Sequence, residues 1–96
     1  MNIEATTILG TFRIVPEVHV DDRGEFWRSY CRQNLAEHGL EFDVWQSNVS
    51  VNPYKHTLRG FHYQQPPSTE QKILTVIKGA LHVVIVDVRL DSPTFM

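Results

Sequence analysis

The sequence predicts an all-β fold, a β-sandwich or jelly roll, with one short helix. Short apolar or alternating segments recur along the 96 residues, and turn-forming residues separate them. The segment at residues 80–88 is dense in β-branched side chains, which indicates burial between two sheets or inside a barrel. The two-residue turn Lys78-Gly79 joins it to residues 72–77 as the clearest hairpin of the chain.

The first part of the chain is expected to hold short strands, one tight turn and the helix. Pro16 ends the first strand, because proline cannot donate to a β-ladder. Gly24 is free to take a positive φ in an acidic turn, and Gly39 ends the helix. In order, we expect a strand at residues 11–15, extended chain at 17–20, a turn at 21–24, a strand at 25–30 and a helix at about 32–38.

The second part returns to strands, at residues 44–51 and 58–64, before the hairpin at 72–88. About six strands result, whereas a jelly roll has eight in two Greek keys. The last residues, 92–96, are typical of a turn that leads into a further strand. We therefore expect residues 1–96 to be the N-terminal portion of a single, larger β domain.

Composition excludes several functional classes. The formal net charge is −2 and no basic stripe is visible, which argues against a nucleic-acid partner. The longest apolar run is residues 83–86, so neither a membrane span nor a signal peptide is predicted. The single cysteine, Cys31, cannot form an internal disulfide, and we expect a small buried residue beside the helix in a cytoplasmic protein.

The segment at residues 58–64 combines a cation, an imidazole and an amide on one predicted strand. Alternation places His62 and Gln64 on one face, together with Gly60, and Arg59 on the other. Gly60 leaves room for a ligand or another backbone to approach. This pattern predicts a pocket. For an isolated His-x-Gln, however, a core or surface histidine without a chemical role is the commoner interpretation.

Several motifs follow one another in a characteristic order: Asp21-x-Arg23-Gly24-x-Phe26, Gln46-x-Asn48-x-Ser50, Leu58-Arg59-Gly60-Phe61-His62-Tyr63-Gln64, and Val86-Asp87-Val88-Arg89 before Ser92-Pro93-Thr94. Pro66-Pro67, Lys72 and Gly79 lie between the last two. In this order and spacing the chain resembles the dTDP-4-dehydrorhamnose 3,5-epimerase family, cupin-fold enzymes of nucleotide-sugar metabolism. The resemblance extends from about residue 11 to residue 95, and it implies a cupin-type jelly roll.

The resemblance implies epimerisation of a dTDP-4-keto-6-deoxyhexose through an enolate, with no cofactor. The carbonyl acidifies the flanking C–H bonds, so a base, a cation and an acid on the opposite face suffice. By resemblance His62 is the base, and an imidazole with an ordinary pKa near ~6.5 suits that role at neutral pH. Arg59 and Lys72 would face the oxyanion or the phosphates. One well-placed donor lowers such a barrier by about 3 kcal/mol.

The resemblance also implies a substrate-binding set. Arg23 would bind the diphosphate with its guanidinium fork, often across a homodimer interface, although a surface ion pair with Asp21 or Asp22 is the alternative. Phe26 would stack on thymine, or else fill the core, which is the safer interpretation for a lone aromatic residue. Gln46 and Asn48 would be ligand-binding amides rather than ordinary edge-strand residues.

A metal-dependent cupin is a further alternative. His62, Glu70 and His82 are residue types that suit several divalent metals. Metal-binding cupins, however, use a His-x-His pair, and this chain has Gln64 at the second position. The epimerase family works without metal, so we predict no metal site.

The chain also departs from the family's usual residues. Arg28 stands where many members carry glutamate, Val83 where many carry aspartate, and Phe61 where leucine is usual. The first two changes leave open an enzyme that inverts only one centre.

The family's catalytic tyrosine, and the aspartate that orients the histidine, belong to a part of the family beyond residue 96. The tyrosines of this chain do not occupy that tyrosine's motif; they are Tyr30, Tyr54 and Tyr63. The second hypothesis is therefore a non-catalytic cupin that acts as a nucleotide-sugar-binding or assembly module.

Overall fold

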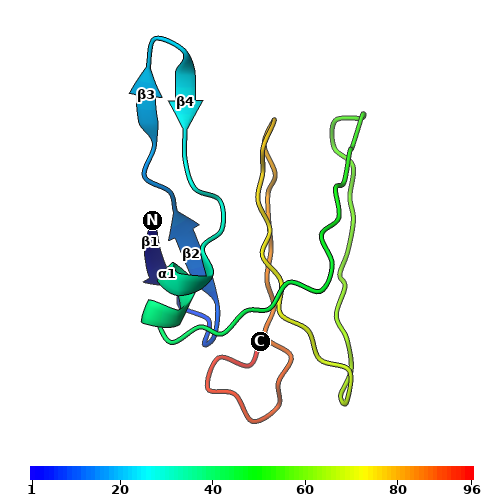
Figure 1. Cartoon of the computed structure of the whole chain (residues 1–96). Helices are drawn as coiled ribbons and strands as arrows, with labels where there is room; N and C mark the ends of the chain where they lie inside the picture. Colours follow the sequence, from blue (N-terminus) through cyan, green and yellow to red (C-terminus); the bar gives the residue numbers. More distant parts are fainter.

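The computed structural model describes all 96 residues and contains four short strands and one helix. The strands form two separate antiparallel hairpins, β1–β2 and β3–β4 (Figure 1). The elements in chain order are β1 (Asn2–Ala5), β2 (Phe12–Val15), β3 (His19–Asp21), β4 (Gly24–Phe26) and α1 (Arg32–Glu37). An all-β arrangement with one short helix is therefore confirmed, whereas neither hairpin by itself defines a jelly roll.

The β1–β2 hairpin brings the start of the chain against the first predicted strand. Its register pairs Ile3 with Ile14 and Glu4 with Arg13. The Arg13 guanidinium donates to the Glu4 carboxylate at 2.8 Å, across the ladder. Ile3 is one of two buried apolar residues in the chain. β1 itself was not predicted, because residues 2–5 become a strand only through this pairing.

The β3–β4 hairpin forms around the predicted turn. The Asp21 carboxylate accepts from the backbone N–H of Arg23 at 2.8 Å, which is the local bond that aspartate offers at such turns. Gly24 has a φ of 128°, a conformation closed to most side chains. β4 ends at Phe26, four residues before the predicted end of that strand.

Helix α1 is capped at both ends by local chemistry. The Cys31 sulfur accepts from the Asn34 N–H at 3.5 Å at the N-terminus. At the C-terminus Gly39 has a φ of 74° and donates to the Ala36 carbonyl at 2.9 Å, as expected for a helix-ending glycine. Leu35 is 3% exposed and is the second buried apolar residue. Cys31 itself is half-buried beside the helix rather than fully buried.

Residues 40–96 contain no helix and no hydrogen-bonded strand. The predictions of strands at residues 44–51, 58–64, 72–77 and 80–88 are therefore wrong for this structure. The course of the chain still follows the prediction. The green segment runs in one direction and then doubles back (Figure 1). The yellow-to-brown segment does the same, with a bend at residues 78–79. These two pairs are hairpin-like in course but have no ladder between them.

The strand ladders are missing because almost none of these side chains is buried. The chain makes 21 backbone–backbone hydrogen bonds, whereas a folded domain of this length makes on the order of ~60. Only Ile3, Leu35 and Asp87 are buried. Val83 and Val84, on opposite faces of the same segment, are each about half exposed. A segment with this sequence requires neighbours on both faces, and residues 1–96 do not supply them.

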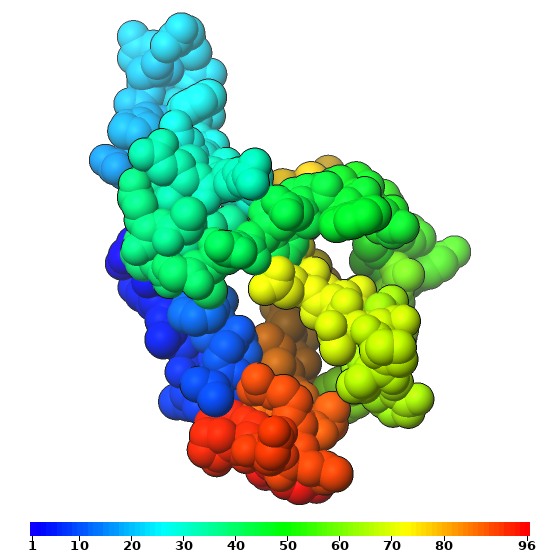
Figure 2. All heavy atoms as spheres, turned by 60° about the horizontal axis from the view of Figure 1, so that its bottom comes forward, coloured from blue at the N-terminus to red at the C-terminus, as the bar shows by residue number.

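One side-chain cluster near the C-terminus connects to the N-terminal part of the chain. We call Asp87, Arg89, Ser92 and Thr94 the Asp87 cluster; the other three residues all donate to the Asp87 carboxylate, at 2.5–2.9 Å. Arg89 also donates to the Leu9 carbonyl at 2.6 Å, and the Leu9 N–H donates to Thr94 Oγ1 at 3.2 Å. The red C-terminal turn therefore lies against the blue N-terminal part (Figure 2).

The single helix, at six residues, is too short and too polar to cross a membrane.

We expect amide hydrogen exchange to divide the chain in two. Amides of residues 72–88 should exchange within about tenfold of an unstructured peptide, because they have no ladder, whereas the Leu35 amide and the β1–β2 amides should be slower. The measurement is exchange followed by two-dimensional NMR at two protein concentrations. Strong, concentration-independent protection of residues 80–88 would contradict this structure.

We expect the Asp87 cluster to weaken in acid. Hydrogen bonds from Arg89, then Ser92 and Thr94, hold the pKa of the Asp87 carboxyl well below its ordinary range. Because the folded pKa is depressed, the cluster's contribution is complete above the ordinary value near ~3.9 and is lost as pH falls below it. Carbon NMR of the Asp87 carboxyl and the Leu9 amide shift report this loss, and Asp87→Asn is the control without the titration. A midpoint at or above ~3.9 would refute the depressed pKa.

Candidate functional site

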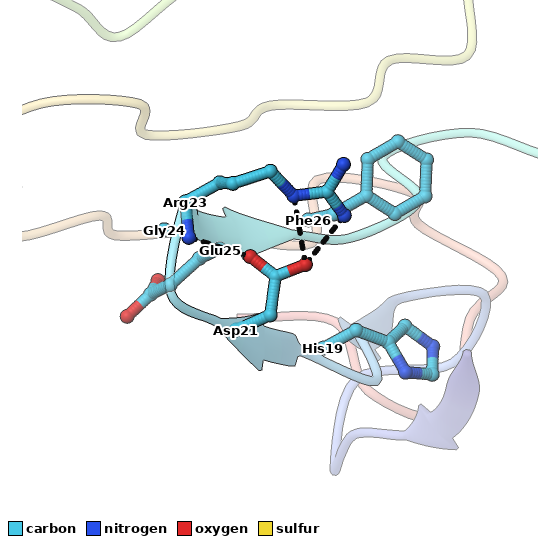
Figure 3. A pocket seen from close by; sticks show the side chains of 6 residues that line it. All are labelled: His19, Asp21, Arg23, Gly24, Glu25 and Phe26. Carbon is cyan, nitrogen blue, oxygen red and sulfur yellow. Dashed lines mark hydrogen bonds and ion pairs between the residues drawn. The ribbon is translucent and has the colours of Figure 1, made fainter.

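The β3–β4 hairpin carries a shallow hollow of about 300 Å³ (Figure 3). The Arg23 side chain folds back over the turn and forms an ion pair with Asp21. Its Nε and one terminal nitrogen both donate to Asp21 Oδ2, at 3.1 Å and 2.5 Å. This bond lowers the pKa of Asp21. The ion pair that was the alternative for Arg23 is therefore present. The Arg23 side chain is nevertheless 90% exposed, so its planar fork is accessible to an anionic ligand.

Phe26 lies on the same face of the hairpin. It is 75% exposed, and it lines the hollow beside the Arg23 guanidinium (Figure 3). The interpretation of Phe26 as a core residue is wrong here, because its ring stays largely exposed. An exposed aromatic ring next to an accessible cation is an arrangement that binds planar, anionic molecules.

Arg59 connects two of the predicted motifs. Its guanidinium donates to Ser50 Oγ at 2.5 Å and to Asn52 Oδ1 at 3.0 Å. These bonds hold residues 58–64 beside residues 44–52, although no ladder forms between the two segments. In this arrangement the charge of Arg59 is used for positioning neighbouring polar groups.

His62, Gln46 and Asn48 are exposed and make no hydrogen bond within the chain. Lys72 forms an ion pair with Glu70, the Nζ to Oε1 distance being 2.8 Å. The structure therefore places a cation on the loop that follows the His62 segment, without a contact between Lys72 and His62.

His62, Glu70 and His82 do not come together as a group that could hold a metal ion. The metal-dependent alternative therefore lacks the cluster on which it depended.

A family profile described as dTDP-4-dehydrorhamnose 3,5-epimerase matches residues 5–96, which include every motif described above. The chain belongs to this family.

Curated relatives agree with this assignment. The dTDP-4-dehydrorhamnose 3,5-epimerase of Mycolicibacterium smegmatis is 36% identical over 96 residues, covering 99% of this chain and 47% of that protein. The enzyme of the same name from Methanothermobacter thermautotrophicus is 36% identical over 90 residues, covering 94% of this chain and 48% of that protein.

The dTDP-4-dehydrorhamnose 3-epimerase of Streptomyces niveus is 34% identical, covering 99% and 46% of the two chains. No solved structure matches. The chain spans about half the length of the curated relatives it matches.

In this member of the epimerase family the predicted site residues lie in three places. Arg23 and Phe26 share the β3–β4 hairpin, which projects away from the green and yellow segments in both views (Figures 1 and 2). Gln46, Asn48, Arg59 and His62 belong to the pair of segments that Arg59 connects. Lys72 lies on the following loop. Residues 1–96 do not gather them into one pocket.

Sequence reasoning missed two residues of the hollow, His19 and Glu25. His19 pairs with Phe26 in the ladder and so lies on the same face. Once the turn at residues 21–24 is fixed, counting outward from it gives this pairing. That signal was available in the sequence.

We expect Arg59→Ala to separate the two segments that Arg59 connects. Both acceptors are on exposed residues, so the loss in overall stability should stay below about 1 kcal/mol. Nuclear Overhauser contacts between residues 50–52 and residue 59 should disappear, while β1–β2 and α1 keep their chemical shifts. Arg13→Ala, which breaks the Glu4 ion pair instead, is the matched control. Unchanged contacts in Arg59→Ala would show that the backbone alone holds the segments together.

Proposed function

We propose that this chain acts in the epimerisation of a dTDP-4-keto-6-deoxyhexose and supplies the proton-abstracting side of the site. The observation that carries the proposal is the family match over residues 5–96, which includes the whole His62 segment. Isomerase chemistry of this kind is what the names of the curated relatives describe. The exposed, unbonded imidazole of His62 supports the proposal, since it is accessible to a substrate.

In the proposed reaction the His62 imidazole removes the proton from a carbon beside the keto group. The electron pair of that C–H bond moves into an enolate, and the negative charge gathers on the former carbonyl oxygen. Arg59 and Lys72 stabilise this oxyanion or the phosphates. A proton returned to the opposite face completes the inversion, so no redox cofactor is consumed. By resemblance, the acid for that step lies in the part of the family beyond residue 96.

Substrate binding is proposed for the remaining residues. Arg23 exchanges its carboxylate partner Asp21 for the diphosphate, a ligand that suits the same bidentate fork. Phe26 stacks on the base, and Gln46 and Asn48 supply amides.

The projecting position of the β3–β4 hairpin, away from the green and yellow segments, supports a homodimer in which Arg23 serves the partner's site (Figures 1 and 2). A cytoplasmic location, which the single unpaired Cys31 supports, is part of the proposal.

A second function is favoured by one observation. His62 has no hydrogen-bond partner that would fix its ring and tautomer, and a general base ordinarily has one. Without that partner the chain would retain nucleotide-sugar binding through Arg23 and Phe26 but not the chemistry. This is the binding or assembly module, and the experiment below separates it from the enzyme.

The test is proton NMR of the protein with dTDP-4-keto-6-deoxyglucose in deuterated water. The signals beside the carbonyl should disappear as deuterium enters, and His62→Ala should slow this exchange at least about 100-fold. His82→Ala is the matched control, because it removes an exposed imidazole from a different segment. Sedimentation of the same sample should show a dimer. Substrate binding with no exchange in the unaltered protein would favour the module instead.

A further inference from the structure

The guanidinium of Arg59 is bonded through a different edge from that of three ion-paired arginines. Those three bind a carboxylate through Nε and one terminal nitrogen, Nη2; they are Arg13, Arg23 and Arg89. Arg59 makes both of its hydrogen bonds through the other terminal nitrogen, Nη1, to Ser50 Oγ and Asn52 Oδ1. Its Nε–Nη2 edge, which binds carboxylates in the other three, makes no hydrogen bond within the chain.

Charge distinguishes Arg59 as well. Its two partners are a hydroxyl and an amide, so neither of them offsets the positive charge of the guanidinium. Carboxylate partners offset that charge in four other arginines, which are Arg13, Arg23, Arg32 and Arg89. Arg59 therefore keeps both its charge and two parallel donors, which is the combination that binds an anionic oxygen.

The side chain of Asn52 uses both ends of its amide in this arrangement. Its Oδ1 accepts from Arg59 at 3.0 Å, and its Nδ2 donates to Ser50 Oγ at 3.3 Å. Ser50 Oγ also accepts from Arg59, at 2.5 Å, so the three side chains form a closed set of hydrogen bonds. An aspartate of the same shape would accept but could not donate, and it would add a negative charge beside the guanidinium.

We propose that Asn52 and Ser50 are positioning residues for Arg59. They fix its guanidinium through Nη1 and, because they are uncharged, leave its charge and its Nε–Nη2 edge for an anionic oxygen of the substrate. The inference rests on the proposed function, in which Arg59 stabilises the oxyanion or the phosphates, and it adds a role for Asn52. A side chain that is fixed before the ligand arrives loses less rotamer freedom on binding.

Titration with inorganic phosphate tests this edge without the reaction. Phosphate should shift the Arg59 Nε–H signal in proton–nitrogen NMR. Asn52→Asp should weaken this binding about threefold or more, because the new carboxylate pairs with the guanidinium. Asn34→Asp is the matched control, since it adds the same charge beside another arginine, Arg28. Nuclear Overhauser contacts between residues 52 and 59 should persist in Asn52→Asp, so a merely structural role predicts no loss of binding.

Deuterium exchange with dTDP-4-keto-6-deoxyglucose distinguishes the two sources of the anionic oxygen. Asn52→Asp should lower kcat/KM at least about fivefold, whereas Asn34→Asp should leave it unchanged. A lower kcat with an unchanged KM would assign Arg59 to the enolate oxygen. A higher KM, together with weaker binding of thymidine diphosphate, would assign it to the phosphates.

Failure of the inference and failure of the proposed function give different results. If phosphate does not shift the Arg59 signal, or if Asn52→Asp binds phosphate as Asn34→Asp does, the inference is wrong whatever the exchange shows. If phosphate binding depends on Asn52 but the unaltered chain exchanges no proton, the proposed reaction fails and the positioning of Arg59 stands. If Asn52→Asp loses its contacts to Arg59, Ser50→Asp decides by the same titration, because it places the carboxylate at the other acceptor.

Discussion

The buried carboxylate of Asp87 is the point on which the arrangement of the chain depends. Its side chain is 2% exposed, and the guanidinium of Arg89 satisfies it while also reaching the Leu9 carbonyl. Leu9 takes part in two hydrogen bonds of this cluster: its carbonyl accepts from Arg89, 80 positions away, and its N–H donates to Thr94, 85 positions away. Every other hydrogen bond or ion pair in the chain joins residues within 13 positions of each other. Without this cluster, the chain would be a series of local elements.

The scarcity of long-range contacts follows from the scarcity of buried apolar surface. Hydrophobic burial normally supplies the main favourable term in folding, and here it is confined to Ile3 and Leu35. Residues 80–88 carry apolar side chains on both faces, which is the pattern of a strand enclosed in a core. The relatives are about twice as long as this chain.

This distinction explains which predictions succeeded. The turn at residues 21–24 and the end of helix α1 depend on chemistry within a few residues: the Asp21 carboxylate on the Arg23 amide, and Gly39 at positive φ. Both were predicted correctly. The predicted strands within residues 44–88 depend on burial by other segments, and an alternating pattern indicates that a segment suits a sheet without supplying the sheet. For the same reason the alternative of Phe26 as a core residue is wrong, because its ring stays largely exposed.

The candidate site follows the same division. The resemblance assigned Arg23 and Phe26 to one substrate-binding set, and both line the same hollow, because one turn positions them. It could not tell whether His62, Arg59 and Lys72 converge, because convergence requires the sheet that places their segments side by side. The hairpin with Arg23 therefore forms its part of the site from local bonds alone, whereas the His62 segment has only the Arg59 bonds to position it. Under the proposed function, the residues assigned to nucleotide binding and to proton abstraction thus lie in structurally separate parts of this chain.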